Sequence, residues 1–321
     1  MRPSIRALVA ALLALPSALA VAPPAHAADP TTMTSGFYVD PDSSAKKWVA
    51  AHPGDGRAPA IDASLAHTPM ARWFGSWSGT IGTATGAYVG AADQRDKLPV
   101  LVAYNIYHRD HCGGHSGGGA ASPTAYASWI AQFAGGIAGR PAVVVLEPDS
   151  LADYGCMTQT QIRERQGMIS GALAEFDRQA PNTWVYLDAG NPGWVSAGTM
   201  AQRLHEAGLR QAHGFSLNIS NHYTTAQNTA YGNAVNGELA ARYGYTKPFV
   251  VDTSRNGNGA NGEWCNAAGR RIGTPTQMGG GAEMLLWIKA PGESDGNCGV
   301  GTGSTAGQFL PDVAYKMIYG Y

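Results

Sequence analysis

Short runs of apolar residues recur along the chain, and most of them end at a polar or charged residue. The run at residues 143–146 stops at Glu147, Pro148 and Asp149. An unbroken apolar run of this length fits a strand that is buried on both faces, as in a parallel sheet. Pro148 cannot donate a hydrogen bond to a neighbouring strand and restricts Glu147 to extended conformations, so we predict that the strand ends there.

Asp149 is therefore expected at the edge of the sheet, beside a dry apolar core. Desolvation at such a position raises the pKa of a carboxyl group and can keep it protonated as a general acid. The alternative is a strand-end turn in which Asp149 caps the following segment. The position alone favours neither interpretation, because perturbed groups mark functional sites only statistically.

The same pattern of an apolar run followed by a polar residue occurs at several further places. These runs are residues 98–103, 184–187, 215–217, 249–251 and 284–288, with residues 36–40 and 70–74 as weaker candidates. Helical spacing of apolar residues predicts helices over residues 124–137 and 159–179. Strands that alternate with helices favour a parallel sheet. Seven or eight such units in one domain favour an α/β fold, a distorted (β/α) barrel, over an open doubly wound sheet, with the active-site cleft at the C-terminal strand ends.

The first 27 residues have the features of a secretory signal peptide. Arg2 and Arg6 precede an apolar run, and Ala25 to Ala27 offer small residues at a cleavage site. No later apolar run is long enough to span a membrane. We therefore expect residues 28–321 to form one secreted catalytic domain.

Charge and glycine spacing narrow the choice of partners. Without Arg2 and Arg6, 20 of the 22 basic residues remain against 23 acidic ones, a net charge of about −3. No basic patch stands out, so we expect neither nucleic acid nor a membrane as a partner, and we expect a monomer. The glycine clusters at residues 117–119 and 279–281 do not open a helix with nucleotide-binding spacing, and we expect no cofactor.

The four cysteines allow three disulfide connectivities, as expected in a secreted chain. We favour pairing of nearest neighbours, Cys112 with Cys156 and Cys265 with Cys298. Cys112 also lies among three histidines whose spacing approaches that of a zinc site, namely His108, His111 and His115. Structural zinc sites usually pair two ligand doublets, so we expect a disulfide here and no metal.

Five segments, in this order, resemble glycoside hydrolase family 6, the endoglucanases and cellobiohydrolases that act on β-1,4-glucan. They are Tyr-Asn-Ile with Arg-Asp in residues 104–110, Val-Leu-Glu-Pro-Asp-Ser-Leu at 145–151, Tyr-Leu-Asp-Ala-Gly at 186–190, Val-Asp-Thr-Ser-Arg-Asn-Gly at 251–257 and Trp-Ile-Lys-Ala-Pro-Gly-Glu-Ser-Asp-Gly at 287–296. The resemblance runs from about residue 36 to the end of the chain.

The resemblance implies a role for each matching residue. Asp149 matches the general acid, Asp110 a second Asp that supports it, and Asp295 the residue proposed as the base, with a water chain as the alternative. Tyr104 matches the ring that crowds the distorted sugar. Ser116 lies in a loop that resembles the family's mobile, water-positioning loop. The implied sugar-binding floor consists of Asp188, Trp194, Asn218, Trp264, Lys289 and Glu293.

Elementary chemistry agrees with these roles. Inverting hydrolysis needs one protonated carboxyl group and space for a water molecule between the two carboxyl groups. Arg109, which we group with the substrate-binding residues, favours the ionised form of Asp110. That negative charge in turn favours the protonated form of Asp149.

Two pairs of the implied sugar-binding residues have alternative interpretations. Indole faces stack on glucose rings, but Trp194 and Trp264 could instead pack in the core. Their Gly-rich surroundings favour exposure. Lys289 and Glu293 could form no more than a surface ion pair, although their position just after the last strand argues against this.

The resemblance implies a secreted, inverting endo-β-1,4-glucanase that acts on cellulose, related β-glucans or cello-oligosaccharides without a cofactor. The short segment from Cys265 to Cys298 favours an open cleft. The alternatives are an exo-acting cellobiohydrolase and a non-catalytic glucan-binding relative, and the intact carboxyl residues argue against the latter. The chain departs from the family pattern at Tyr107, where Pro is usual, at the inserted His111, and at Asn191, where His is common.

Overall fold

The computed structural model describes Met1, residues 29–114 and residues 116–321. The predicted signal peptide, apart from Met1, lies outside the described residues, as does His115.

Within the described residues, eight strands form one sheet in the order β1-β2-β3-β4-β5-β6-β8-β7. Every neighbouring pair is parallel except β7 and β8, which are antiparallel. The strands are β1 Arg72–Phe74, β2 Val100–Ala103, β3 Ala142–Leu146, β4 Thr183–Asp188, β5 Gly214–Leu217, β6 Phe249–Asp252, β7 Gln277–Met278 and β8 Met284–Leu286. The predicted distorted barrel is confirmed. The weaker candidate at residues 36–40 contributes only an isolated bridge between Phe37 and Leu98.

The sheet curls so that its first and last parallel strands meet. The N–H of Ala71 donates to the carbonyl of Trp287 at 2.8 Å, and the indole N–H of Trp73 donates to the carbonyl of Ile288 at 2.8 Å. Alternate strand residues therefore face either the barrel interior or the surrounding helices. In β2, for example, Val102 packs inside the barrel, whereas Leu101 belongs to the core beneath the helices. Burial on both faces explains why the strand sequences are unbroken apolar runs.

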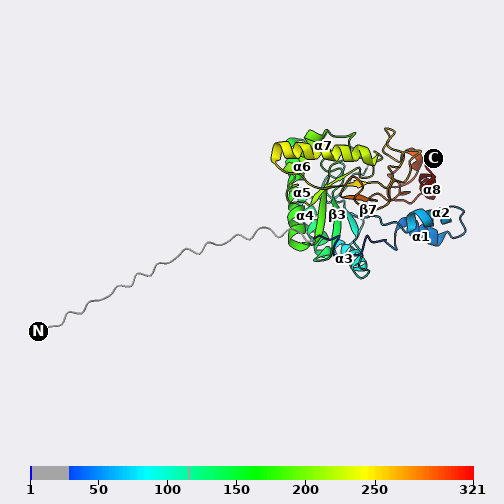
Figure 1. Ribbon diagram of the computed structural model, residues 1–321, viewed down its shortest axis with the longest axis horizontal. Coiled ribbons are helices and arrows are strands. Elements are labelled where there is room, and N and C mark those ends of the chain that lie inside the picture. Colours follow the sequence, from blue (N-terminus) through cyan, green and yellow to red (C-terminus); the bar gives the residue numbers. More distant parts are fainter. Residues whose placement is uncertain (2–28, 115) are drawn as a thin grey trace.

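Helices cover the outside of the barrel (Figure 1). They are α3 Ile81–Asp93, α4 Pro123–Ile137, α5 Gln159–Gln179, α6 Ala197–Glu206 and α7 Thr225–Tyr243. The predicted helices at 124–137 and 159–179 correspond to α4 and α5. The long helices α5 and α7 begin at capping boxes formed by Thr158 with Gln161 and by Thr224 with Gln227. No helix in the described part of the chain is long and apolar enough to cross a membrane.

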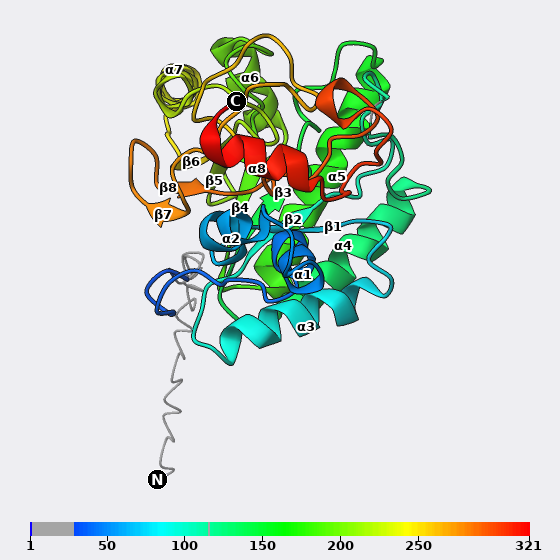
Figure 2. The same ribbon diagram turned by 90° about the vertical axis from the view of Figure 1, so that its right-hand side faces the viewer.

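A second, smaller layer covers the side where β1 and β8 meet (Figure 2). Its elements are α1 Ser44–Ala51, α2 Ala58–Ile61, η1 Asp62–Ala66 and α8 Pro311–Tyr319, and a short helix η2 Gly299–Gly301 precedes α8. Ile61, Leu65 and Ala314 pack against Trp287 in a separate apolar cluster. Residues from the N-terminal and C-terminal parts of the chain therefore pack together over the place where β1 and β8 meet.

Helices α3 and α4 approach each other closely at Gly136. A Cβ atom at this position would lie 2.0 Å from Oγ1 of Thr85 and 2.5 Å from the carbonyl oxygen of Gly82. The Thr85 hydroxyl is itself fixed by donating to the carbonyls of Ile81 and Phe133. The contact leaves no room for a side chain, because packed interiors relax only partly.

Gly136→Ala should lower the free energy of unfolding by about 1–3 kcal/mol, because overpacking forces the two helices apart. Gly171→Ala in α5 is the matched control, since nothing lies within 4 Å of its added Cβ. That control should instead stabilise the protein by about 0.5–1 kcal/mol through helix propensity. Urea unfolding of both variants checks the prediction, and equal effects of the two substitutions would contradict it.

Candidate active site

A cleft of about 1230 Å³ opens at the C-terminal ends of the parallel strands. Loops that follow seven different strands contribute to its walls, and ten of the twelve predicted catalytic and substrate-binding residues line it. These ten are Tyr104, Arg109, Asp110, Ser116, Asp149, Trp194, Trp264, Lys289, Glu293 and Asp295. Strand ends far apart in the sequence are thus brought to one site, as in other barrels of this kind.

Asp149 follows β3 and lies against the end of β4. Its backbone N–H donates to Oδ2 of Asp188 at 2.8 Å, and its φ angle is +70°. Burial raises the pKa of Asp149 well above its usual range, and the charges of Asp188, Asp110 and Asp153 raise it further. A carboxyl group in these surroundings stays protonated at pH values where an ordinary Asp is ionised.

Glu147 has a structural role that the sequence did not reveal. The strand ends at Leu146 as predicted, but the extended conformation expected for Glu147 is wrong, because its φ angle is +49°. This turn directs the buried carboxylate towards the end of β2, where it accepts hydrogen bonds from the N–H groups of Asn105 at 2.8 Å and Ile106 at 2.9 Å. Burial raises the pKa of Glu147 to about 7. The hydrogen bonds offset the backbone strain and connect the end of β3 to the segment that leads to Asp110.

Asp188 and Asn218, both predicted to contact sugar, lie beneath the cleft and do not line it. Asp188 is 1% exposed and also accepts a hydrogen bond from the N–H of Gly190. Asn218 is fully buried, and its amide donates to the carbonyls of Tyr223 and Asp252. Both side chains therefore support the backbone of the cleft floor from below.

The loop after β2 is folded around the guanidinium group of Arg109. This group donates to the carbonyls of Tyr104 at 2.7 Å and Ser116 at 2.8 Å and lies 4.3 Å from the centre of the Tyr104 ring. The predicted influence of Arg109 on Asp110 therefore does not involve an ion pair. Instead, the carboxylate of Asp110 accepts a hydrogen bond from the N–H of Ser116, which brings these two predicted site residues together.

Both predicted disulfides are confirmed. Cys112 is bonded to Cys156 with Cα atoms 5.5 Å apart, and Cys265 to Cys298 with Cα atoms 6.0 Å apart. The first bond removes Cys112 from the possible zinc ligands. Among the described residues, no group of three or more His, Cys, Asp or Glu side chains has a geometry that could hold a metal ion.

Asp295 lies between two basic side chains. Its carboxylate accepts hydrogen bonds from Nη1 of Arg255 at 2.8 Å and from the N–H of Asn266 at 2.9 Å, and lies 3.4 Å from Nζ of Lys289. Burial acts to raise the pKa of Asp295, but the charges of Arg255 and Lys289 outweigh it and lower the pKa to about 2. Lys289 thus pairs with Asp295 and not with Glu293, the partner considered from the sequence. Arg255 is a further functional candidate because it binds Asp295. The sequence indicates it only as part of the motif at residues 251–257.

Exposed indole rings line the cleft. Trp194 is 46% and Trp264 40% exposed, so the predicted exposure is confirmed over core packing. Trp77 is 57% exposed, lines the same cleft and lies 5.5 Å from the guanidinium carbon of Arg109. The sequence prediction missed Trp77, although it stands between Gly75-Ser76 and Ser78-Gly79 and the argument from Gly-rich surroundings applies to it equally.

A parallel barrel whose cleft holds one carboxyl group with a raised pKa, a second with a lowered pKa and exposed indole rings has the features of a glycoside hydrolase. Residues 32–318 match the family described as Glycosyl hydrolases family 6. The chain therefore belongs to glycosyl hydrolase family 6, and the resemblance noted in the sequence is confirmed.

Individual relatives agree with this assignment. Endoglucanase 1 of Streptomyces halstedii is 80% identical over 317 residues, which cover 99% of each chain. Endoglucanase A of Thermobispora bispora is 42% identical over 321 residues, which are 98% of this chain and 67% of that protein. The solved structure of the endoglucanase Cel6 from Mycobacterium tuberculosis is similar with a TM-score of 0.82 at 38% identity, over 91% of this chain and 99% of its own.

Asp188→Asn should move the alkaline limb of the pH dependence of kcat/KM to lower pH. The change removes a negative charge that raises the pKa of Asp149, so Asp149 loses its proton at lower pH, while the remaining amide oxygen can still accept its N–H. Asp177→Asn on the exposed face of α5 is the control and should leave the limb in place. Initial rates on a soluble cellulose derivative between pH 4 and 10 measure the shift. An alkaline limb that moves upwards or stays fixed in Asp188→Asn would contradict the assignment of that limb to Asp149.

Proposed function

We propose that this protein is a secreted, inverting endo-β-1,4-glucanase that hydrolyses internal bonds of cellulose and related β-glucans. The observation that carries the proposal is the carboxyl group of Asp149, which is kept protonated by its surroundings and faces a cleft lined with exposed indole rings. Protonation of the leaving oxygen by a positioned acid is the step that glycoside hydrolysis requires of such a group.

In this proposal Asp149 donates its proton to the glycosidic oxygen as the bond to the anomeric carbon breaks. Asp110 lies in the same cleft, and its charge raises the pKa of Asp149. The same negative charge stabilises the positive charge that develops on the sugar ring in the transition state. Tyr104, which is 8% exposed, closes the cleft wall next to these two carboxyl groups.

The role of Asp295 follows from its low pKa. A general base works best when its pKa lies near the operating pH, and a carboxylate with a pKa of about 2 is a weak proton acceptor. Between the two routes that the family resemblance implies, this favours a chain of water molecules that carries the proton away from the attacking water. Asp295 then serves as a permanent negative charge that orients the water and holds Lys289 in the cleft.

The choice of substrate and cutting mode draws on the cleft and on the relatives. Flat indole faces stack on glucose rings, which suits a neutral glucan chain. The Mycobacterium tuberculosis endoglucanase was solved in complex with methyl-cellobiosyl-4-deoxy-4-thio-β-D-cellobioside. Relatives named endoglucanases reach 80% and 42% identity, whereas a probable exoglucanase of Podospora anserina reaches 30%. These identities favour internal cutting over the exo-acting alternative.

Assembly and location complete the proposal. One chain supplies Asp110, Asp149 and Asp295 to a single cleft, which is consistent with a monomer acting on glucan. Two disulfides are typical of proteins from an oxidising compartment and support secretion.

Asp149→Asn should reduce kcat on carboxymethylcellulose by about 100- to 10,000-fold, because the amide cannot donate an acidic proton. Cello-oligosaccharide binding, followed by tryptophan fluorescence, should change little, since the indole rings stay in place. A substrate with a good leaving group needs less protonation and should retain more activity, which serves as the internal control. Near-normal hydrolysis of carboxymethylcellulose by this variant would exclude Asp149 as the acid.

Hydrolysis should release new reducing ends as the α-anomer, because a water molecule attacks the face opposite to the leaving group. Proton NMR during the first minutes of cello-oligosaccharide hydrolysis distinguishes the anomers before they equilibrate. Initial release of the β-anomer would show retention and would contradict the inverting mechanism. A rapid fall in the viscosity of the glucan per reducing end formed is the expected sign of internal cutting.

A further inference from the structure

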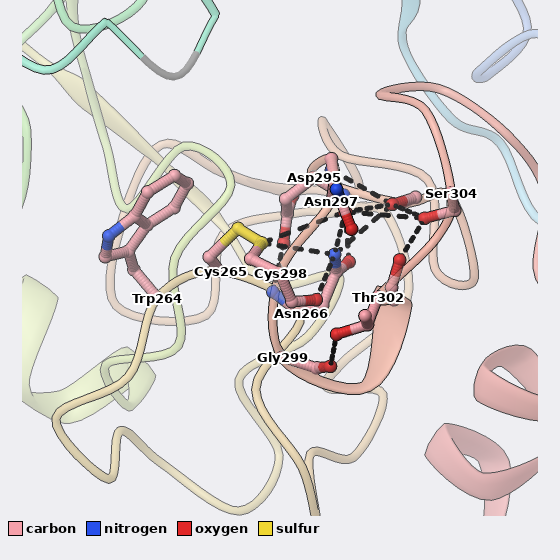
Figure 3. The surroundings of a disulfide bond; sticks show 12 residues. Trp264, Cys265, Asn266, Asp295, Asn297, Cys298, Gly299, Thr302 and Ser304 are labelled. Atoms are coloured by element: carbon pink, nitrogen blue, oxygen red, sulfur yellow. Dashed lines mark hydrogen bonds between the residues drawn. A yellow bond between two sulfur atoms is a disulfide. The ribbon is translucent and has the colours of Figure 1, made fainter.

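Asn266 forms a reciprocal pair of hydrogen bonds with Asp295. Its backbone N–H donates to Oδ2 of Asp295 at 2.9 Å, and its side-chain Oδ1 accepts from the backbone N–H of Asp295 at 2.8 Å. Figure 3 shows Asn266 beside the disulfide formed by Cys265 and Cys298, with hydrogen bonds that connect it to Asp295. The same residue therefore contacts both the main chain and the carboxylate of Asp295.

The side-chain amide nitrogen of Asn266 forms hydrogen bonds with residues on either side of Asp295. It donates to the carbonyl of Gly296 at 2.8 Å and lies within hydrogen-bonding distance of the carbonyl of Cys298 at 3.1 Å and of Oγ of Ser294 at 3.2 Å. A Cβ atom at Gly301 would lie 2.3 Å from this nitrogen, so the segment wraps closely around the side chain. Asn266 is 2% exposed, and the contact is protected from water.

Asn266 also has a backbone conformation that needs support. Its φ angle is +44°, which is uncommon for a residue with a side chain. The preceding Cys265 is covalently joined to Cys298, and the N–H of Val300 donates to the carbonyl of Asn266 at 3.0 Å. The disulfide and this hydrogen bond fix the backbone on both sides of the strained residue.

We propose that Asn266 is a positioning residue for Asp295, and that the Cys265–Cys298 disulfide holds Asn266 in the conformation that this role requires. The inference rests on the proposed role of Asp295. Arg255 and Lys289 supply the charge that keeps the carboxylate ionised, whereas Asn266 fixes the direction in which it points. Because Trp264 precedes the disulfide, the same segment joins a cleft indole to the carboxylate of Asp295.

Asn266→Ala should lower kcat on a soluble cellulose derivative by about 10- to 100-fold and change KM by less than about threefold, because a misplaced carboxylate affects the reaction more than substrate binding. Asn266→Asp provides a second variant. Its carboxylate would add a negative charge beside Asp295, raise the pKa of Asp295 from about 2, and move the acid limb of the kcat/KM profile to higher pH. The shift of this limb shows that residue 266 acts on Asp295, whereas the loss of kcat at nearly constant KM in Asn266→Ala shows that Asn266 positions the carboxylate.

The matched control is Asn297→Asp in the same loop. Asn297 is exposed, and its Oδ1 accepts a hydrogen bond from the N–H of Gly303 that a carboxylate can also accept. This variant should keep kcat, KM and the acid limb close to those of the parent protein. Replacing both Cys265 and Cys298 by Ala should lower kcat in the same direction as Asn266→Ala. The two changes should be less than additive when combined, since they act through one contact.

Three outcomes overturn the inference. Unchanged kcat together with an unchanged acid limb in folded Asn266→Ala and Asn266→Asp would remove the positioning role. Full additivity of Asn266→Ala with the disulfide variant would remove the link to the disulfide. Asp295→Asn separates this inference from the proposed function. If Asp295→Asn is inactive while Asn266→Ala is normal, only the positioning role fails, and if Asp295→Asn is active, the role of Asp295 fails as well.

Discussion

The carboxyl group of Asp149 is held where burial and the charges of three neighbouring carboxyl groups oppose its ionisation. Parallel strands make this arrangement possible, because their carboxyl ends meet at one edge of the sheet. Asp149 follows β3 and Asp188 ends β4, and the contact between them runs through the backbone N–H of Asp149. Asp188 therefore fixes the backbone of the proposed acid while its charge raises the pKa of the same residue. This contact orients the group and adds to the effect of burial on its pKa.

Burial also acts to raise the pKa of Asp295, but this group behaves in the opposite way. Its partners are Arg255 and Lys289, so the ionised form is stabilised and the pKa falls to about 2. Two carboxyl groups in one cleft are thus driven to opposite protonation states by their partners, which is the usual way in which one site performs acid catalysis at neutral pH. Arg255 follows β6, and Lys289 and Asp295 both follow β8. These positions explain why, of the two carboxyl groups, only Asp295 has basic partners.

The sequence predicted the strand ends well because unbroken apolar runs have one physical explanation, burial on both faces of a sheet. It could not predict which polar residues at those ends point into the cleft. Glu147, Asp149 and Asn218 all have positive φ angles, and no glycine marks these turns. Each turn changes the direction of its side chain relative to an extended chain. Glu147 and Asn218 come to face protein backbone, whereas Asp149 faces the cleft. Hydrogen bonds from distant segments stabilise these conformations, and a local pattern does not contain them.

The residues proposed to act on substrate lie mostly in loops beyond the strands, where few apolar contacts are available. Hydrogen bonds and disulfides hold these loops in place of apolar contacts. The Cys112–Cys156 disulfide joins the Asp110 loop to the segment after Asp149, and Glu147 binds the start of that loop through two N–H groups. The Cys265–Cys298 disulfide similarly joins the Trp264 and Asp295 segments. Because a loop without such restraints would sample many conformations, each restraint limits the directions in which a proposed catalytic group can point. The apolar core then governs the stability of the barrel, whereas this smaller set of restraints governs the geometry of the cleft.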